Sequence, residues 1–261
     1  MGRSRKRIHL LDEVRGFSLV LMVFFHAFYL IGYSYGVDFC RELFDFFFPA
    51  QPFFSGLFIF ICGISCNLSH NNLKRGLLLL GAAVLLSGVM WCATFWRMVT
   101  ADNQIWFGIL HLLAVCILLY TVLRPVLSHI TPWFGLAVCA VLFVLCYHVP
   151  ASMGGYFGVR SLFTVAIPSA PINHPLLYPL GLCPIRPCGD YVPLLPWLFC
   201  FFGGTFTGVW AKRRQFPKWT YRNRFPSLSW LGRHTLLIYL FHQPILYVLC
   251  EAVQWVIKRL F

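Results

Sequence analysis

Long apolar runs separated by short polar stretches dominate the hydrophobic pattern of this chain. A membrane-spanning helix needs about 20 mainly apolar residues, and most of these runs reach or approach that length. A glycine-rich run also fits, because membrane helices tolerate glycine where neighbouring helices approach closely. The pattern predicts about seven membrane-spanning helices, at 16–34, 50–68, 76–96, 107–123, 131–149, 191–211 and 231–257.

A Pro- and Gly-rich stretch, which includes "IPSAPINHPLLYPLGLCPIRPCGDY", interrupts this pattern between 150 and 190. Its prolines exclude a regular helix. The nearby "YFGVRSLFTVAI" is compatible with a short or re-entrant segment, and the pattern leaves this open. We therefore predict one all-α domain over 1–261, a polytopic transmembrane helix bundle.

The amino-acid composition indicates that most of the protein surface does not face water. Hydrophobic residues make up 59% of the chain and charged residues only 11%, whereas soluble domains carry about 25% charged residues. The mean hydropathy is +0.73. The basic start resembles a secretory signal, but the apolar run after it is too long and lacks a small-residue cleavage site. We expect an integral membrane protein, in contact with the lipid bilayer, that retains its first helix.

The net charge of +13 raises the question of nucleic acid binding. With seven spans and a cytoplasmic N-terminus, fifteen of the 21 basic residues fall inside, including the cluster "AKRRQFPKWTYRNR". This distribution follows the positive-inside rule, so the charge reports orientation and we expect no nucleic acid partner. The six basic residues placed outside are Arg41, Arg97, Arg160, Arg186, Lys258 and Arg259.

The eleven cysteines mostly stand singly in apolar runs, where they are typical of packing. Cys62 and Cys66 are one helical turn apart, but two thiols alone make a poor metal site, and we expect no metal. Cys183 and Cys188 flank "PIRP" in the predicted outer loop. They are equally compatible with a disulfide in an oxidising compartment and with free thiols.

Ionisable residues within the apolar runs are candidates for chemistry, because burying them in a bilayer is costly. His26 lies near the middle of the first predicted span, where a neutral imidazole can act as a general base. Packing through a hydrogen bond to a neighbouring helix is an equal alternative. Arg15 follows Asp12 by three residues, so the two can pair on one helical face. Arg15 is either an interfacial anchor or an anion site.

Other candidates accompany the later spans. His111 lies early in the fourth span, and Asp190 precedes the sixth, where it can cap a helix or bind a hydroxyl or amine. The last span carries "GRHTLLIYLFHQP", in which a proline can free backbone carbonyls for a ligand. Its spacing matches no zinc motif. The ionisable or polar residues there are Arg233, His234, His242 and Gln243.

Five fragments in order carry a resemblance to a known family: "RIHLLDEVRGFSLVLMVFFH", "GLFIFICGISCNLSHNNLKRG", "FGILHLLAV", "DYVPLLPWL" and "LGRHTLLIYLFHQPIL". Together they resemble bacterial membrane proteins grouped with the catalytic domain of heparan-alpha-glucosaminide N-acetyltransferase. That domain belongs to a clan of membrane acyltransferases that includes the type 3 acyltransferases. The resemblance covers nearly the whole chain and is loosest from about 125 to 175.

The resemblance implies transfer of an acetyl group from cytosolic acetyl-CoA to an acceptor across the membrane. Type 3 acyltransferases carry a functional arginine and histidine separated by ten residues, as Arg15 and His26 are. The resemblance makes His26 a base or acyl carrier, with His111 and His242 as rivals. The resemblance gives Arg15 a role in holding the coenzyme A end. From electrostatics we expect Arg15, Lys74 and Arg75, with part of the region 212–224, to form a basic rim, and we also expect Arg233 to contact coenzyme A.

One departure limits this inference. The lysosomal enzyme is thought to use a histidine in the lumenal loop after the first helix, and here that loop, "GYSYGVDFCRELFDFF", contains none. Neither that mechanism nor the heparan substrate can be transferred. The loop does carry Asp38, Glu42 and Asp45, and we expect Asp45, with Asp190 and Gln243, to help bind the acceptor.

The sequence therefore predicts an acetyltransferase of a bacterial inner membrane that modifies a cell-envelope sugar or other glycan. The alternative is a transporter or flippase of small or lipid-linked substrates without acyl chemistry, in which buried histidines relay protons. No strongly apolar helix that carries a carboxylate supports this alternative, and its one deep acidic candidate is Glu251. A non-enzymatic membrane scaffold is a third interpretation.

Overall fold

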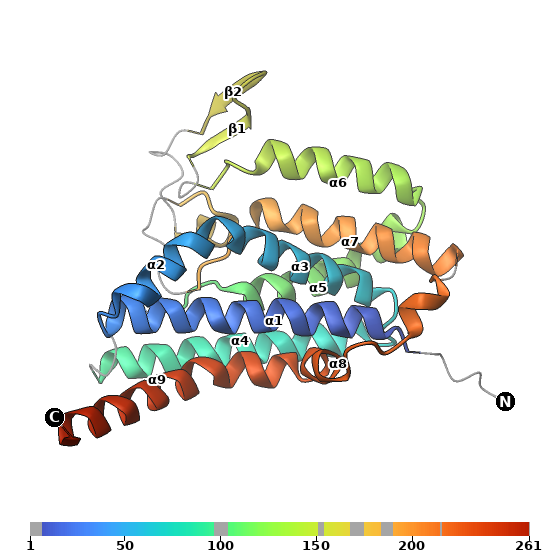
Figure 1. Cartoon of the computed structure of the whole chain (residues 1–261). Coiled ribbons are helices and arrows are strands. Elements are labelled where there is room, and N and C mark those ends of the chain that lie inside the picture. Colours follow the sequence, from blue (N-terminus) through green and yellow to red (C-terminus); the bar gives the residue numbers. More distant parts are fainter. Residues whose placement is uncertain are drawn as a thin grey trace. The chain divides into compact units, whose positions relative to one another are not determined.

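The computed structural model describes residues 7–96, 104–150, 154–167, 175–183, 190–214 and 216–260. In this part of the chain nearly all regular structure is helical, as predicted (Figure 1). The helices are α1 (His9–Tyr29), α2 (Asp38–Phe47), α3 (Gln51–Cys66), α4 (Asn72–Phe95), α5 (Ile109–Leu127), α6 (Pro132–Cys146), α7 (Leu194–Arg214), α8 (Pro226–Arg233) and α9 (Thr235–Leu260). Shorter helical turns are Leu30–Ser34, Phe48–Ala50, Pro175–Leu180 and Lys218–Tyr221, and the strands are β1 (Tyr156–Val159) and β2 (Phe163–Ala166).

The predicted spans correspond to helices. Six segments of the described chain are long and apolar enough to cross a membrane. The remaining predicted span, 131–149, contains α6, an apolar helix of 15 residues. The prediction of a polytopic helix bundle is therefore confirmed. The six long segments are His9–Ser34, Asp38–Cys66, Asn72–Phe95, Ile109–Leu127, Leu194–Arg213 and Thr235–Val256.

Two boundaries differ from the prediction. The segment after the first span, which we expected to be a loop, contains α2 and is continuous with the second span. An acidic residue in the first helical turn, Asp38, favours this helix through the macrodipole. The predicted last span, 231–257, also begins too early, because α8 ends at Arg233 and α9 begins at Thr235.

Local signals explain several helix starts. The side chain of Asn71 accepts a hydrogen bond from the backbone N–H of Lys74 at 2.8 Å and so caps α4. Pro132 and Pro226 are the first residues of α6 and α8. Proline suits this position, because the first N–H of a helix has no partner within it and the fixed φ of proline is already helical.

The chain divides into two compact units. The first combines residues 1–58 with 215–261, so it contains both ends of the sequence. The second is one continuous stretch, 59–214. The boundary falls within α3, so the two units share this helix. Within the first unit α1 packs against α2, α8 and α9.

Two glycines allow α1 and α8 to pack backbone against backbone. A Cβ atom on Gly16 would lie 2.0 Å from the carbonyl oxygen of Leu228, and one on Gly232 would lie 1.9 Å from that of Asp12. Both distances are far below van der Waals contact. The glycines of "DEVRG" and "LGR" therefore hold the first span close to α8.

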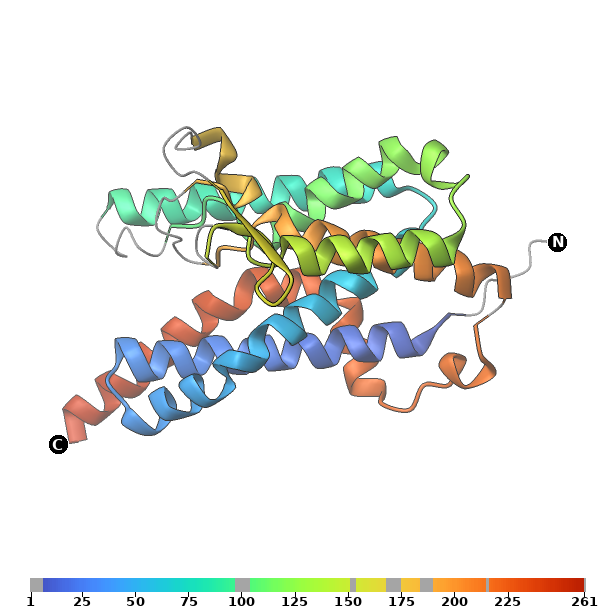
Figure 2. The same cartoon turned by 90° about the horizontal axis from the view of Figure 1, so that it is seen from above.

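The second unit consists of paired helices. Within it α4 packs against α5, and α6 packs along α7 (Figures 1 and 2). The glycine-rich character of α7 has the role expected for membrane helices. A Cβ atom on Gly204 would lie 2.1 Å from the carbonyl oxygen of Phe60, so this glycine permits close contact with α3.

The stretch that the sequence left open contains an antiparallel hairpin. Strand β1 pairs with β2, with Tyr156 opposite Ala166 and Val159 opposite Phe163. In the part of 150–190 that the structure describes, the other regular element is the short turn Pro175–Leu180, and no spanning helix occurs. Cys188 lies outside the described residues, so the choice between a Cys183–Cys188 disulfide and free thiols is not tested.

Candidate functional site

Two of the three candidate histidines lie together in the first unit. His26 of α1 and His242 of α9 are separated by more than 200 residues in sequence. Their ring centroids are 5.1 Å apart, with the ring planes inclined at 64°. The packing of α1 against α9 therefore forms a histidine pair within two predicted spans.

Backbone carbonyls fix the tautomer of both rings. Nδ1 of His26 lies 3.0 Å from the carbonyl oxygen of Met22, and Nδ1 of His242 lies 2.7 Å from that of Tyr239. A carbonyl oxygen only accepts hydrogen bonds, so we assign the hydrogen of each ring to Nδ1. In the neutral rings both Nε2 atoms then carry a lone pair, which is the form that can act as a base or a nucleophile.

The Nε2 atom of His242 is buried without a partner. His242 is 7% exposed, and none of the described residues offers this atom a hydrogen bond. Nearly all buried polar atoms in proteins are hydrogen-bonded, because an unpaired one costs free energy. The basic nitrogen of His242 is therefore suited to a polar group brought by a ligand.

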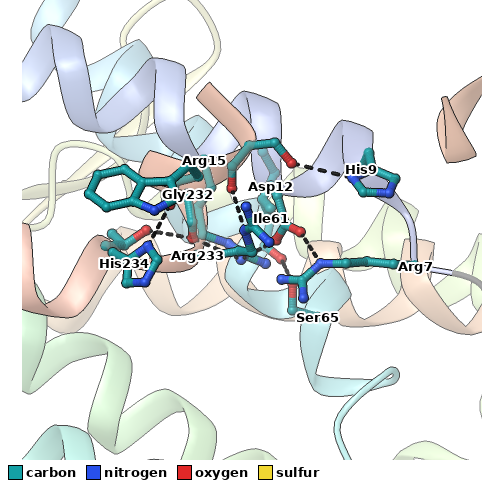
Figure 3. A network of polar contacts seen from close by, with 12 residues as sticks. Arg7, His9, Asp12, Arg15, Ile61, Ser65, Gly232, Arg233 and His234 are labelled. Carbon is teal, nitrogen blue, oxygen red and sulfur yellow. Dashed lines mark hydrogen bonds and ion pairs between the residues drawn. The ribbon is translucent and has the colours of Figure 1, made fainter. Parts of the chain in front are cut away.

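An arginine cluster lies at the start of α1 (Figure 3). Asp12 is buried, and each of its carboxylate oxygens accepts a hydrogen bond from a different guanidinium group: Arg15 at 3.1 Å and Arg7 at 2.6 Å. The predicted Asp12–Arg15 pair is thus present. Because two arginines share one carboxylate, the cluster keeps a formal charge of +1.

Glu13, which the sequence analysis did not single out, joins α1 to α8. Its side chain is buried, and Oε1 accepts the backbone N–H groups of Arg224 at 2.7 Å and Phe225 at 3.1 Å. These groups lie at the N-terminus of α8, where the helix dipole favours a negative charge. The two neighbouring acids therefore have different roles: Asp12 binds two arginines, and Glu13 binds backbone N–H groups at the N-terminus of α8.

The junction of α8 and α9 holds further candidates. Arg233 is exposed, and its Nε donates to the carbonyl oxygen of Ser229 at 3.3 Å. Nδ1 of His234 donates to the carbonyl oxygen of Trp230 at 2.9 Å. Arg15 also approaches this region, with Nη1 3.5 Å from the carbonyl oxygen of Gly232. Gln243 directly follows His242 in α9.

His111 lies in the second unit and is bonded at both ring nitrogens. Nδ1 accepts the backbone N–H of Gly108 at 3.3 Å, at the start of α5. Nε2 lies 3.4 Å from the hydroxyl oxygen of Ser87, which itself donates to the carbonyl oxygen of Ile105 at 2.6 Å. Nε2 must then donate, so His111 offers no lone pair to a substrate in this arrangement.

The remaining basic candidates, Lys74 and Arg75, lie in the first turn of α4 in the second unit. Lys74 is exposed and Arg75 is half-buried. Both therefore belong to a different unit from Arg15 and Arg233. Their membership of a common basic rim stays a prediction.

The acidic candidates are dispersed. Asp45 is exposed and accepts a hydrogen bond from the hydroxyl of Tyr33 at 2.8 Å. Asp190 does not occupy the N-cap of α7, which begins at Leu194; it packs against Gly108 at the start of α5. Glu251 accepts a hydrogen bond from Tyr35 at 2.8 Å. Among the described residues, no three His, Cys, Asp or Glu side chains are placed to hold a metal ion.

The fold and the site define a polytopic membrane protein with a histidine pair between its first and last predicted spans and an arginine cluster at the start of the first. Residues 7–244 match the family described as heparan-alpha-glucosaminide N-acetyltransferase, catalytic, and the chain belongs to this family. No curated protein and no solved structure matches it. The family implies a membrane acetyltransferase, which agrees with the resemblance noted in the sequence.

Proposed function

We propose that the protein transfers an acetyl group from cytosolic acetyl-CoA to a hydroxyl or amine of a cell-envelope sugar or glycan, in the inner membrane of a bacterium. Membership of the family supports the acetyltransferase class. The donor, the acceptor and the particular membrane belong to the proposal. The observation that carries it is the pair formed by His26 and His242, with both Nδ1 atoms bonded to carbonyls.

A histidine pair of this kind is compatible with two routes of acetyl transfer. In the direct route, one Nε2 removes the proton of the acceptor as its oxygen or nitrogen attacks the thioester carbon. The carbon–sulfur bond then breaks, and the coenzyme A thiolate takes up a proton. In the two-step route, Nε2 of His26 attacks the thioester carbon, the carbon–sulfur bond breaks and coenzyme A leaves as a thiolate. Nε2 of His242 then takes the proton of the acceptor as it attacks the acetyl carbon, the bond to His26 breaks, and this proton passes to the thiolate or to solvent. Both routes end in coenzyme A and acetylated acceptor.

The arginine cluster suits the donor's charge. Coenzyme A carries several negative phosphate charges, and a guanidinium group presents a planar fork of donors that fits a phosphate. Asp12 bonds to one Nη atom of Arg15 and to Nε of Arg7, so the cluster stays ordered and keeps a net positive charge. We assign Arg15 the main role, with Arg233, Lys74 and Arg75 contributing to electrostatic steering.

The other candidates take secondary roles in the proposal. Gln243 follows His242 and is the first choice for orienting the acceptor, with Asp45 and Asp190 as further candidates. His111, whose two nitrogens are bonded within the protein, is assigned to the structure of the α5 N-terminus. His26 and His242 are then the histidines proposed to act on substrates.

The test is acetyl transfer by the purified protein in lipid nanodiscs. Release of free thiol from acetyl-CoA is measured with glucosamine as a probe for amine acceptors and N-acetylglucosamine as a probe for hydroxyl acceptors. We expect acceptor-dependent thiol release, together with thermal stabilisation by coenzyme A. Absence of both would overturn the proposal. Proton-coupled flux in liposomes without thiol release would instead support a transporter.

A further inference from the structure

The hairpin formed by β1 and β2 presents an unusual surface. Every residue from 160 to 166 is exposed, including all four residues of β2. The largest exposed apolar side chains are Leu162 at 80%, Phe163 at 48% and Val165 at 58%. Arg160 is the one charged residue between 154 and 167. Antiparallel hairpins in water normally turn a polar face outward, and this one does not.

The hairpin is fixed to the C-terminal end of α6. The backbone N–H of Tyr156 donates to the carbonyl oxygen of His148 at 3.0 Å, and the rings of these two residues stack with centroids 4.7 Å apart. Figure 1 shows the two strands beyond that end of the helix. The position of the hairpin along the membrane normal is therefore tied to that of α6.

α6 is too short to cross a bilayer. Its 15 residues span about 22 Å at 1.5 Å per residue, whereas the hydrocarbon core is about 30 Å thick. Its surface is nonetheless suited to lipid, because apolar side chains such as Phe134, Val141 and Val144 are more than half exposed. The hairpin therefore begins close to the hydrocarbon boundary, and its exposed apolar residues continue the apolar surface of α6.

The unpaired backbone groups of the hairpin limit the depth at which it can lie in the membrane. A two-stranded sheet has two edges, and unpaired N–H and C=O groups are too costly within the hydrocarbon core. In bulk water, an apolar exposed edge strand would promote aggregation. The headgroup region satisfies both constraints, since it hydrates the edge and accepts apolar side chains to a depth of about 5–10 Å. Arg160, whose guanidinium lies 5.4 Å from the Tyr156 ring centroid, can reach lipid phosphates.

We propose that residues 160–166 form a membrane-interface anchor, with Leu162, Phe163 and Val165 inserted among the phospholipids of the leaflet at the C-terminal end of α6. The partner is the lipid surface, and the proposal does not depend on acetyl transfer. It gives the short span that contains α6 a physical continuation, because the apolar surface of the helix extends through the hairpin into the headgroup region.

The test places the photo-crosslinking residue p-benzoylphenylalanine at position 162 of the full chain. The protein is reconstituted in nanodiscs of phosphatidylethanolamine and phosphatidylglycerol, irradiated, and examined by intact mass spectrometry. We expect the mass to rise by one phospholipid. The same probe at Val141 is the positive control for lipid contact, and at the exposed Ser128, in the loop that precedes α6, it is the negative control.

Two outcomes would overturn the proposal. Lipid adducts at 141 without lipid adducts at 162 would place the hairpin in water. A covalent dimer through position 162 would mean that a second copy of the chain, and not lipid, covers the hairpin. Circular dichroism of each labelled protein checks that it is folded before irradiation.

Discussion

The imidazole rings of His26 and His242 form a T-shaped contact at 5.1 Å, although one belongs to the first predicted span and the other to the last. Each ring is oriented by a carbonyl of its own helix, so the contact does not depend on a hydrogen bond between the two. This arrangement leaves both Nε2 lone pairs available for chemistry. We therefore predict that both histidines contribute to acetyl transfer.

Replacing either histidine of the pair by alanine should reduce acetyl transfer. We expect His26→Ala and His242→Ala each to lower turnover by roughly a hundredfold, as the loss of a general base typically does. The matched control is His129→Ala, because Nδ1 of His129 also bonds to a carbonyl four residues earlier but the side chain is exposed. Full activity in a folded His26→Ala protein would contradict the assignment.

Arg15→Lys should weaken coenzyme A binding by roughly tenfold, which corresponds to about 1.4 kcal/mol. Lysine keeps the charge but loses the fork of donors that fits a phosphate. Isothermal titration with coenzyme A measures the effect, and Arg41→Lys, on an exposed arginine of α2, is the control. Unchanged affinity would mean that Arg15 only anchors α1 against α8.

Glu13→Ala should destabilise the protein without directly removing a proposed catalytic group. The backbone N–H groups of Arg224 and Phe225 would lose their acceptor, and loss of a helix cap costs about 1–2 kcal/mol. A lower melting temperature in detergent is the expected result. Glu42→Ala, an exposed acid of α2, should leave it within error. Equal melting temperatures for the two variants would contradict the capping role.

Gly16→Ala should also destabilise the protein, through a steric clash between α1 and α8. The added methyl group would lie 2.0 Å from the carbonyl oxygen of Leu228, so α8 must move away, at a cost of at least about 1–3 kcal/mol. Gly81→Ala is the matched control, since a Cβ there has no atom within 4 Å and alanine favours the helix. Folded yield and melting temperature compare the two, and equal values would refute the close packing.

Orientation in the membrane is a separate prediction. If all seven predicted spans cross, the excess of basic residues on one side predicts a cytoplasmic N-terminus and a C-terminus outside. An alkaline phosphatase reporter fused after Phe261 should therefore be active, because that enzyme works only in the periplasm. A cytoplasmic reporter that is active at the same position would show that one of the seven segments, with the short α6 the first suspect, does not cross.

The sequence predicted the spans well because a hydrophobic run of about 20 residues is a strong signal in itself. It also predicted the Asp12–Arg15 pair, since an i, i+3 spacing on a helix is a local property. The helix α2 was not predicted, because its charged residues and the short turn next to it resemble a loop. The partner of His26 could not be predicted, because spacing along the chain says nothing about which distant helix packs against α1.

The role of Glu13 illustrates the same limit. The sequence shows only that Glu13 follows Asp12 at the start of the first span. Its partners are backbone N–H groups more than 200 residues away. Backbone groups leave no trace in sequence. Gly16 and Gly232 gave a weak signal at most, because glycine is common in membrane helices for several reasons.

The first unit is made from the two ends of the polypeptide, 1–58 and 215–261, whereas the second is continuous. During synthesis the second unit can therefore assemble while the ribosome is still extending the chain. Until α8 and α9 have been synthesised, Glu13 lacks its backbone N–H partners and Gly16 lacks its contact with Leu228. The histidine pair therefore forms only after α9 has been synthesised, and a chain that stops before α9 lacks it.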